Sequence, residues 1–312
     1  MTATASVQPE SSNTPRSEPA APRPRKNGAS ARSKAGMSGM RTAYMFLKTG
    51  TCAEATMNVV DRAFDDPLPA EERSVMPLAG GIGQHGYQCG MLWGSTLAAG
   101  LQAYRRLGPG PNAEAAAVAA AQRIVTSFRA CHQHIDCLEI TETDWRKKLQ
   151  AFKFLLKGGP VSCVRRVVNF APVAFGEISA ALSDVAAGAP AAPVSCAALV
   201  AKRMGQSDLH ATMAAGFAGG IGLSGGACGA LGAAIWIVEM TRGGPGASYD
   251  AVNARASETV ERFLKASDYQ FECSAIVGRK FENTDDHAGY LQSGGCCKII
   301  DVLAGALQVG AA

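Results

Sequence analysis

Cysteines are the residues of this sequence best suited to chemistry, because a thiolate is both a nucleophile and a soft metal ligand. The chain of 312 residues contains ten of them, and eight recur as two sets of four at matching intervals. Since each pair of intervals differs by only a few residues, the sequence predicts a duplicated four-cysteine unit. Intervals of 37, 48 and 26 positions separate the first set, Cys52, Cys89, Cys137 and Cys163. Intervals of 32, 45 and 24 positions separate the second set, Cys196, Cys228, Cys273 and Cys297.

The second cysteine of each set follows a glycine-rich stretch that the chain contains twice. The copies read GGIGQHGYQCG over residues 80–90 and GGIGLSGGACG over residues 219–229. Both also match the G-x-G-x-x-G pattern of dinucleotide sites, but the first copy lacks the acidic residue that such a site needs about 20 positions later. We interpret the stretch as a seat for the cysteine, because glycine lets backbone amides approach a sulfur closely. The glycines of this site loop are Gly80, Gly81, Gly83, Gly86 and Gly90, and in the second copy Gly219, Gly220, Gly222, Gly225 and Gly229.

Most of these cysteines follow a turn or a helix-breaking residue, which places them at or beside a predicted helix N-terminus. Unpaired N–H groups and the positive end of the helix dipole stabilise negative charge there. We therefore expect lowered thiol pKa values and a pocket in each unit suited to an anionic cluster or a reactive dithiol. The six cysteines in this position are Cys52, Cys89, Cys163, Cys196, Cys228 and Cys297.

Four thiolates fit more than one chemistry. Our leading hypothesis is electron transfer through one iron–sulfur cluster per unit, which needs four cysteine ligands but no C-x-x-C spacing. A second hypothesis is a relay of reversible disulfides that exchange through a reactive thiolate. A third is a non-redox metal-binding module, although structural zinc sites usually use closely spaced cysteine pairs. The plain alternative is that the cysteines pack as small hydrophobic side chains. The residues do not decide whether the protein is an enzyme.

The four-cysteine arrangement resembles the C-GCAxxG-C-C family of redox-active proteins, in which the second cysteine lies in a CGAxxG motif after a glycine-rich stretch. The matching residues are CGMLWG at 89–94 and CGALGA at 228–233. The first copy departs from the motif at Met91 and the second at Ala233, and neither departure removes a sulfur. The resemblance covers nearly all of the chain after residue 36 as two tandem units, and it implies redox or metal chemistry at the cysteines.

The segment 131–137 adds candidate accessory residues, Cys131, His132 and His134, beside Cys137. These side chains could bind zinc or copper, or place a histidine beside a cluster. The second unit lacks both histidines, so a function common to the two units cannot need them. Histidines near the C-terminus of a helix, where the dipole favours them, are the simpler interpretation.

Two further candidates stand beside the repeated set. His85 precedes Cys89 by four residues and could tune the first site alone. Cys296 lies next to Cys297 and outside the matching intervals. We expect His287 to lie at the surface.

Helical periodicity runs through the chain and no alternating run of useful length appears. The predicted fold is all-α, with two tandem homologous helical-bundle units behind a disordered N-terminal tail. The tail spans residues 1–35, the first unit 36–170 and the second 171–312, with one helix ending at Phe170 and the next beginning at Ala171. The tail is rich in Ser, Pro, Ala and Arg, and cannot bury enough apolar surface to offset its conformational entropy. We expect the two units to pack against each other as a pseudo-twofold pair.

Net charge and hydropathy limit the classes of partner that the protein could bind. The net charge of +4 arises within residues 1–35, so the rest of the chain is neutral and gives a nucleic-acid-binding face no electrostatic support. Residues 211–240 contain one charge and are long enough to cross a membrane, but eight glycines between positions 216 and 232 oppose a helix there. We therefore predict no nucleic-acid partner and no membrane span. With no secretory signal in the sequence, we predict a cytoplasmic location, where reducing conditions disfavour structural disulfides. The redox partner is not identified.

Overall fold

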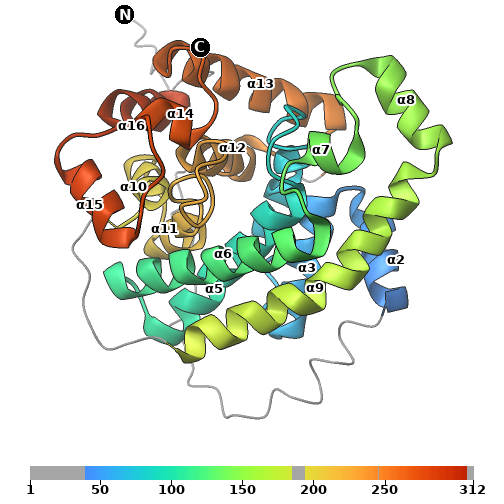
Figure 1. Cartoon of the computed structure of the whole chain (residues 1–312), viewed down its shortest axis with the longest axis horizontal. Coiled ribbons are helices and arrows are strands. Elements are labelled where there is room, and N and C mark those ends of the chain that lie inside the picture. The colour runs from blue at the N-terminus through green and yellow to red at the C-terminus, as the bar shows by residue number, and fades with distance from the viewer. Residues whose placement is uncertain (1–38, 185–193, 245, 308–312) are drawn as a thin grey trace, which may run out of the picture.

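The computed structural model describes residues 39–184, 194–244 and 246–307, and every regular element within them is a helix (Figure 1). The predicted all-α class is confirmed, whereas the predicted tail, residues 1–35, lies outside the described residues. The first half contains α2 Gly39–Thr49, α3 Cys52–Ala63, α4 Pro69–Ser74, the 3-10 helix η1 Met76–Leu78, α5 Gly90–Leu107, α6 Pro111–His132, α7 Cys137–Thr141, α8 Lys148–Leu156 and α9 Gly159–Ser183. The second half contains α10 Cys196–Arg203, α11 Asp208–Ala215, α12 Gly229–Arg242, α13 Tyr249–Ala266, α14 Cys273–Val277, α15 Thr284–Gln292, α16 Cys297–Ala304 and the 3-10 helix η2 Gly305–Leu307.

Corresponding helices of the two units begin at corresponding cysteines. α3 begins at Cys52 and α10 at Cys196, and each follows a hydroxyl N-cap, Thr51 or Ser195, that accepts the N–H of the third helical residue. α5 corresponds to α12 and α7 to α14, and each starts at or directly after a cysteine. Figure 1 shows α10–α16 at the left and top of the molecule and the first-unit helices below and to the right.

One predicted helix boundary is wrong. The sequence predicts a helix that ends at Phe170 and another that begins at Ala171, whereas α9 is continuous and contains Pro172. A proline inside a helix removes one backbone hydrogen bond. Burial of an apolar stripe that includes Phe170 and Ile178, on a helix that packs against α2, α3, α5 and α6, offsets this loss. The unit boundary at residues 170/171 falls inside this helix and stays a prediction.

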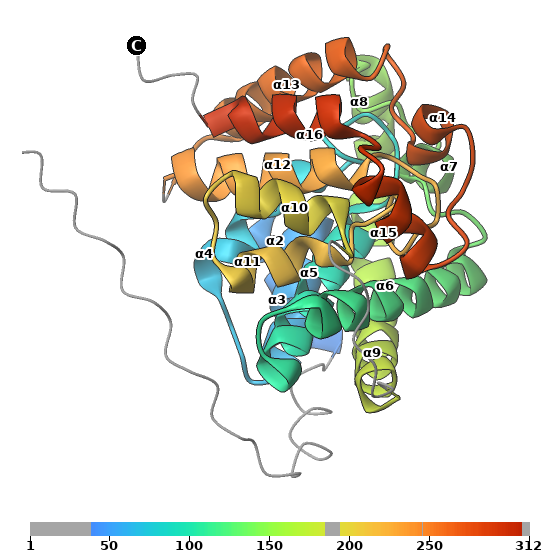
Figure 2. The ribbon, with the colours of Figure 1, turned by 90° about the vertical axis from the view of Figure 1, so that its left-hand side faces the viewer.

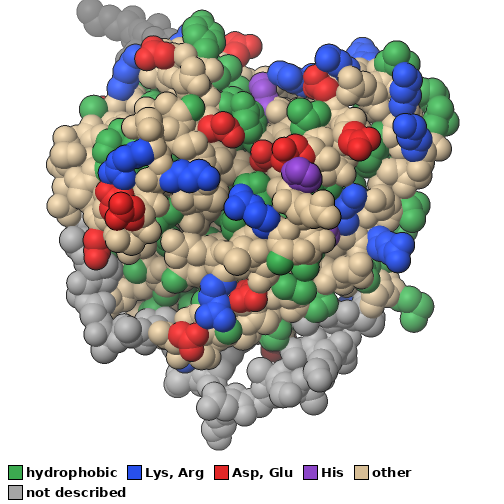
Figure 3. Space-filling model, in the orientation of Figure 1, with side chains coloured by type: hydrophobic (Ala, Val, Ile, Leu, Met, Phe, Trp, Pro, Cys, Tyr) green, Lys and Arg blue, Asp and Glu red, His purple; other side chains and the backbone are tan. Residues whose placement is uncertain are grey.

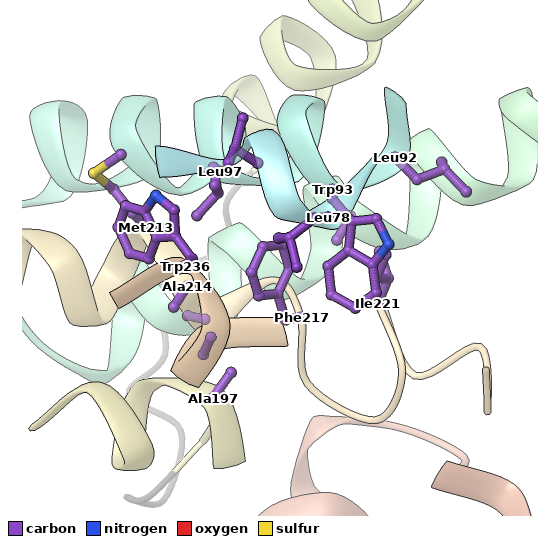
Figure 4. Close-up of a cluster of buried hydrophobic side chains, with 14 of the residues drawn as sticks. Leu78, Leu92, Trp93, Leu97, Ala197, Met213, Ala214, Phe217, Ile221 and Trp236 are labelled. Atoms are coloured by element: carbon purple, nitrogen blue, oxygen red, sulfur yellow. The ribbon is translucent and has the colours of Figure 1, made fainter. Parts of the chain in front are cut away.

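The two units share one hydrophobic core. α5 packs against α11, and α4 packs against α12. Figure 2 shows α10–α13 and α16 of the second unit stacked above α3, α5 and α6 of the first. Trp93 and Leu97 of the first unit lie among Met213, Phe217 and Trp236 of the second (Figure 4). The rings of Trp93 and Phe217 meet edge to face with centroids 4.7 Å apart. This continuous core holds the two units in one fixed arrangement.

Equivalent positions of the two units meet at this interface. Trp93 and Gly232 each stand four residues after a cysteine in the repeated motif. A Cβ atom on Gly232 would overlap the Trp93 ring. The missing side chain in one unit therefore accommodates the large side chain of the other. Contact between equivalent positions is what a pseudo-twofold arrangement produces.

The apolar segment 211–240 is divided into α11, a glycine turn and α12. Within the described ranges, no helix is both long and apolar enough to cross a bilayer. On the face seen in Figure 3, acidic and basic side chains are interspersed over a mostly uncharged surface.

We expect Gly100→Ala to destabilise the protein and Gly176→Ala to leave it unharmed. A Cβ on Gly100 would lie 2.5 Å from the Cα of Met213 across the α5–α11 contact, whereas one on Gly176 meets nothing within 4 Å. Overpacking of this kind costs about 1–3 kcal/mol, and replacing an open helical glycine gains roughly 0.5–1 kcal/mol. Thermal unfolding of both variants measures the difference, and equal melting temperatures would contradict the close contact.

Candidate functional site

Each glycine stretch folds into a left-handed turn, which explains its composition. Five consecutive residues have positive φ in each copy, with 72°, 79°, 55°, 61° and 65° over residues 80–84 and 59°, 81°, 65°, 57° and 60° over residues 219–223. This backbone costs roughly 1–2 kcal/mol for a residue with a Cβ, and the three glycines of each turn avoid that cost. The isoleucine of each turn, Ile82 or Ile221, is fully buried. Core packing therefore holds the strained residue in place.

Two backbone hydrogen bonds hold the second cysteine of each unit beside the third. In the first unit, the N–H of Cys89 donates to the carbonyl of Ile135 at 2.8 Å, and the N–H of Cys137 donates to the carbonyl of Tyr87 at 2.6 Å. The second unit repeats both bonds in the same register, so the two sites are built alike. There the bonds join Cys228 to Phe271 at 2.9 Å and Cys273 to Gly226 at 2.7 Å.

The first cysteine of each unit accepts several backbone N–H groups. The Cys52 sulfur accepts hydrogen bonds from Gly80, Ala53 and its own amide. The Cys196 sulfur accepts them from Gly219 and from the starts of α10 and α12. The sequence predicts that the glycine stretch seats the cysteine that follows it. The first amide of the left-handed turn serves the cysteine that opens α3 or α10, whereas the second cysteine accepts N–H groups from the start of α5 or α12.

The thiols of the first unit differ in acidity. The Cys89 thiol donates a hydrogen bond to the Cys52 sulfur, and this bond lowers the pKa of Cys52 against the opposing effect of burial. The same bond and burial raise the pKa of Cys89 well above its usual range. Burial raises the pKa of Cys137 and Cys163 to about 12. The expected general lowering of thiol pKa is therefore wrong, because desolvation outweighs the helix N-termini at most of these sulfurs.

Burial also dominates the thiols of the second unit. It raises the pKa of Cys196, Cys228 and Cys273, and that of Cys296 to about 11. Backbone N–H groups oppose the rise at Cys196, but the causes of its shift include no thiol donor of the kind that Cys89 gives to Cys52. The two sites therefore share their backbone framework and differ in the acidity of the first cysteine.

Four cysteines of the second unit line one largely enclosed cavity, together with apolar side chains. Its volume is ≈ 20 Å³, about enough for one water molecule. Among the described residues, no three His, Cys, Asp or Glu side chains form a group that could hold a metal ion. The four sulfurs on the cavity are those of Cys196, Cys228, Cys273 and Cys296.

The fourth sulfur on this cavity belongs to Cys296, whereas the spacing of the cysteines predicts Cys297. Cys296 is the N-cap of α16 with φ 59°, and its Sγ lies 4.0 Å from the Tyr290 hydroxyl. Cys297 is the first residue of α16 and is exposed. Because Cys296 has a left-handed backbone, its side chain and that of Cys297 point in different directions. Spacing along the sequence cannot distinguish two adjacent cysteines.

The fourth cysteine of the first unit lies inside a helix. Cys163 is the fifth residue of α9 and is half-buried, so its predicted place at the helix start is only approximate. The charges of Cys52, Cys137 and Cys163 affect one another's pKa, which places the three in one electrostatic group. Trp145 donates its Nε1–H to the Cys137 sulfur at 3.3 Å. The first site therefore has one indole donor in addition to its backbone donors.

The candidate residues of segment 131–137 lie in different surroundings. Cys131 is exposed on the last turn of α6. The Nδ1 atom of the His134 ring lies 3.2 Å from Oε2 of Glu139. The His132 ring packs edge to face against Phe128 with centroids 4.5 Å apart, and burial lowers its pKa.

His85 makes a contact between the two units, and His287 does not lie at the surface as predicted. The His85 ring packs against Phe271 of the second unit, with centroids 5.0 Å apart. His287 is buried rather than at the surface, because its Nδ1 lies 2.9 Å from the carbonyl oxygen of Val194, and it lines the second-unit cavity. Tyr290 lines the same cavity. No sequence pattern marks either residue, since the first unit has no matching histidine or tyrosine signal.

We expect small alkylating reagents to modify Cys52 with a pH midpoint below that of an ordinary thiol, about 8.5. Cys89→Ala removes the thiol donor and raises this midpoint, whereas Cys89→Ser keeps an O–H donor and changes it less. Site-resolved mass spectrometry of protein labelled across a pH series measures the three midpoints. An unchanged midpoint in Cys89→Ala would show that the Cys89 thiol does not set the acidity of Cys52.

Comparison with known proteins identifies the family. No curated protein and no solved structure matches the chain. One family model, described as "Putative redox-active protein (C_GCAxxG_C_C)", matches residues 51–172 and again residues 193–308. Each match begins just before the first cysteine of a unit and spans all of that unit's site cysteines, so the tandem arrangement is confirmed. The two matches cover most of the chain, which therefore belongs to the C_GCAxxG_C_C family as two tandem units.

Proposed function

We propose that each unit carries electrons through an iron–sulfur cluster held by its four site cysteines. The observation that supports this proposal most directly is the second-unit cavity, which cysteines from four separate segments line. The same backbone framework recurs around Cys89 and Cys137 of the first unit. The proposed ligands are Cys52, Cys89, Cys137 and Cys163 in the first unit and Cys196, Cys228, Cys273 and Cys296 in the second.

The donor set fits such a group. Four cysteine thiolates are the usual ligands of iron–sulfur clusters, and a bound cluster would supply a one-electron couple. The amides of Gly80 and Gly219 donate hydrogen bonds to the first sulfur of each unit. Such bonds stabilise negative charge on sulfur, and together with burial they set the potential of a cluster. The thiols of the second unit leave only ≈ 20 Å³ between them, so the lining side chains must move outward when the site is loaded.

A second candidate function is thiol–disulfide exchange in the first unit, favoured by the hydrogen bond from the Cys89 thiol to the Cys52 sulfur. The Cys52 thiolate would attack a disulfide of a partner protein and release one partner thiolate. Cys89, after giving up its proton, would then displace the second partner sulfur from Cys52. The products are a Cys52–Cys89 disulfide and a reduced partner dithiol, so two electrons pass to the partner.

We expect anaerobically purified protein to contain iron and acid-labile sulfide in similar amounts and to absorb visible light. Metal analysis, sulfide analysis and absorption spectroscopy measure these quantities. A colourless, iron-free protein that also fails to take up iron and sulfide on anaerobic reconstitution would rule out the cluster. If that protein reversibly forms a Cys52–Cys89 disulfide, detected by mass spectrometry, the second candidate holds.

The neighbouring cysteines of α16 provide a matched test of the ligand set. We expect Cys296→Ser to halve the iron and sulfide content, because it removes one ligand of the second unit only. Cys297→Ser changes the exposed neighbour and leaves the content unchanged. Equal loss in both variants, or loss in Cys297→Ser alone, would contradict the assignment of Cys296.

A further inference from the structure

One side chain of the first unit reaches into the site loop of the second. Gln88, directly before Cys89, is fully buried. Its Nε2–H donates to the carbonyl oxygen of Gly220 at 2.9 Å, and its Oε1 accepts the N–H of Ala227 at 2.9 Å. Both partners belong to the second glycine stretch, more than 130 positions away. One amide side chain therefore holds two separate points of that loop.

The loop that Gln88 contacts is the one that lies beside the sulfurs of the second unit. Gly220 follows Gly219, whose N–H donates to the Cys196 sulfur. Ala227 precedes Cys228, which lines the same cavity. One hydrogen bond of Gln88 is therefore made next to Gly219, the amide donor of the Cys196 sulfur. The other is made next to Cys228. A single peptide unit therefore separates each bond from the group beside it.

The loop is shaped around this side chain. A Cβ on Gly226 would lie 2.6 Å from Cδ of Gln88 and would also overlap its Nε2. The equivalent position in the first unit is Tyr87. The glycine at position 226 is therefore required by the approach of Gln88, at a point where the first copy of the motif has a tyrosine.

The link runs in one direction only. Gln88 and Ala227 occupy the same position of the repeated motif, one residue before the second cysteine. Alanine has no side-chain donor or acceptor, so the second unit cannot return these bonds to the first glycine stretch. The asymmetry lies in this pair of residues, although the backbone framework of the two sites is the same.

We propose that Gln88 is a positioning residue through which the first unit sets the geometry and the redox potential of the second-unit site. The part concerning potential rests on the proposed function, and the part concerning geometry does not. Hydrogen bonds to sulfur stabilise the more negative, reduced state of a sulfur-ligated centre. Holding the loop in place maintains the Gly219 donor and thereby raises the potential of the second site. Ala227, at the position equivalent to Gln88, gives the first site no counterpart of these two bonds.

The test compares Gln88→Met, which keeps the length of the side chain and removes both bonds, with Gln102→Met as the matched control. Gln102 is also a mostly buried glutamine of the first unit, but it donates to Asp66 within that unit. The first readout is the alkylation rate of Cys196 relative to Cys52 in the metal-free, reduced protein, measured by mass spectrometry. The second is the potential of each site in the loaded protein, with the second site assigned by its loss in Cys296→Ser.

We expect Gln88→Met to speed labelling of Cys196 severalfold while labelling of Cys52 is unchanged, because the loss of the two Gln88 bonds loosens the loop at Gly220 and Ala227. In the loaded protein, we expect the potential of the second site to fall and that of the first site to stay constant. The loss of a buried hydrogen bond corresponds to roughly a tenfold change in the equilibrium constant for reduction. Gln88→Glu keeps an acceptor for the N–H of Ala227 and loses the donor to Gly220, so we expect smaller changes in Cys196 labelling and in the second-site potential. This variant is used if Gln88→Met does not fold.

Unchanged Cys196 labelling in both variants would overturn the proposal, as would equal changes at Cys52 and Cys196 or the same effect in Gln102→Met. If no cluster can be loaded, the proposed function fails, but the labelling comparison still decides whether Gln88 positions the second site. If labelling changes and both potentials stay constant, Gln88 shapes the loop without setting the potential, and that half of the proposal is wrong.

Discussion

The structure depends on how buried sulfur is supplied with hydrogen-bond donors. A thiol in an apolar interior resists ionisation, and burial accordingly raises the pKa of Cys137, Cys228 and Cys273. The fold opposes this effect by directing backbone amides at the first sulfur of each unit, from a helix start and from the first residue of a left-handed turn. Five residues of positive φ are needed to aim that amide, and this requirement accounts for the repeated glycines.

The same turn ties the sulfur site to the core. Its isoleucine is fully buried in each copy, and the residues after it pair with the backbone around the third cysteine. Strain in the turn, burial of the isoleucine and the register of two cysteines are therefore set together. A change at any one of these points disturbs the others, which is why the stretch and its cysteine occur as one unit of sequence.

Duplication produced two sites with one framework but different surroundings. The shared core lets the units be asymmetric where they touch, as at Trp93 against Gly232 and Gln88 against Ala227. Near the sulfurs, the first site has the Trp145 donor and the thiol-to-thiol bond, whereas the second has His287 and Tyr290 on its cavity. The two sites therefore combine a common backbone framework with different neighbouring side chains.

The sequence by itself determined the helical class and the duplication, and it predicted which cysteines form the two sites. These features follow from local periodicity, from spacing along the chain and from glycine positions, and the linear sequence contains all three. Tertiary structure decided the rest. It chose Cys296 over Cys297 through one left-handed residue at a helix cap, and it carried α9 past Pro172 because burial offsets a lost hydrogen bond. It also reversed the expected acidity of most thiols, since desolvation depends on everything packed around a sulfur and no spacing in the chain records that.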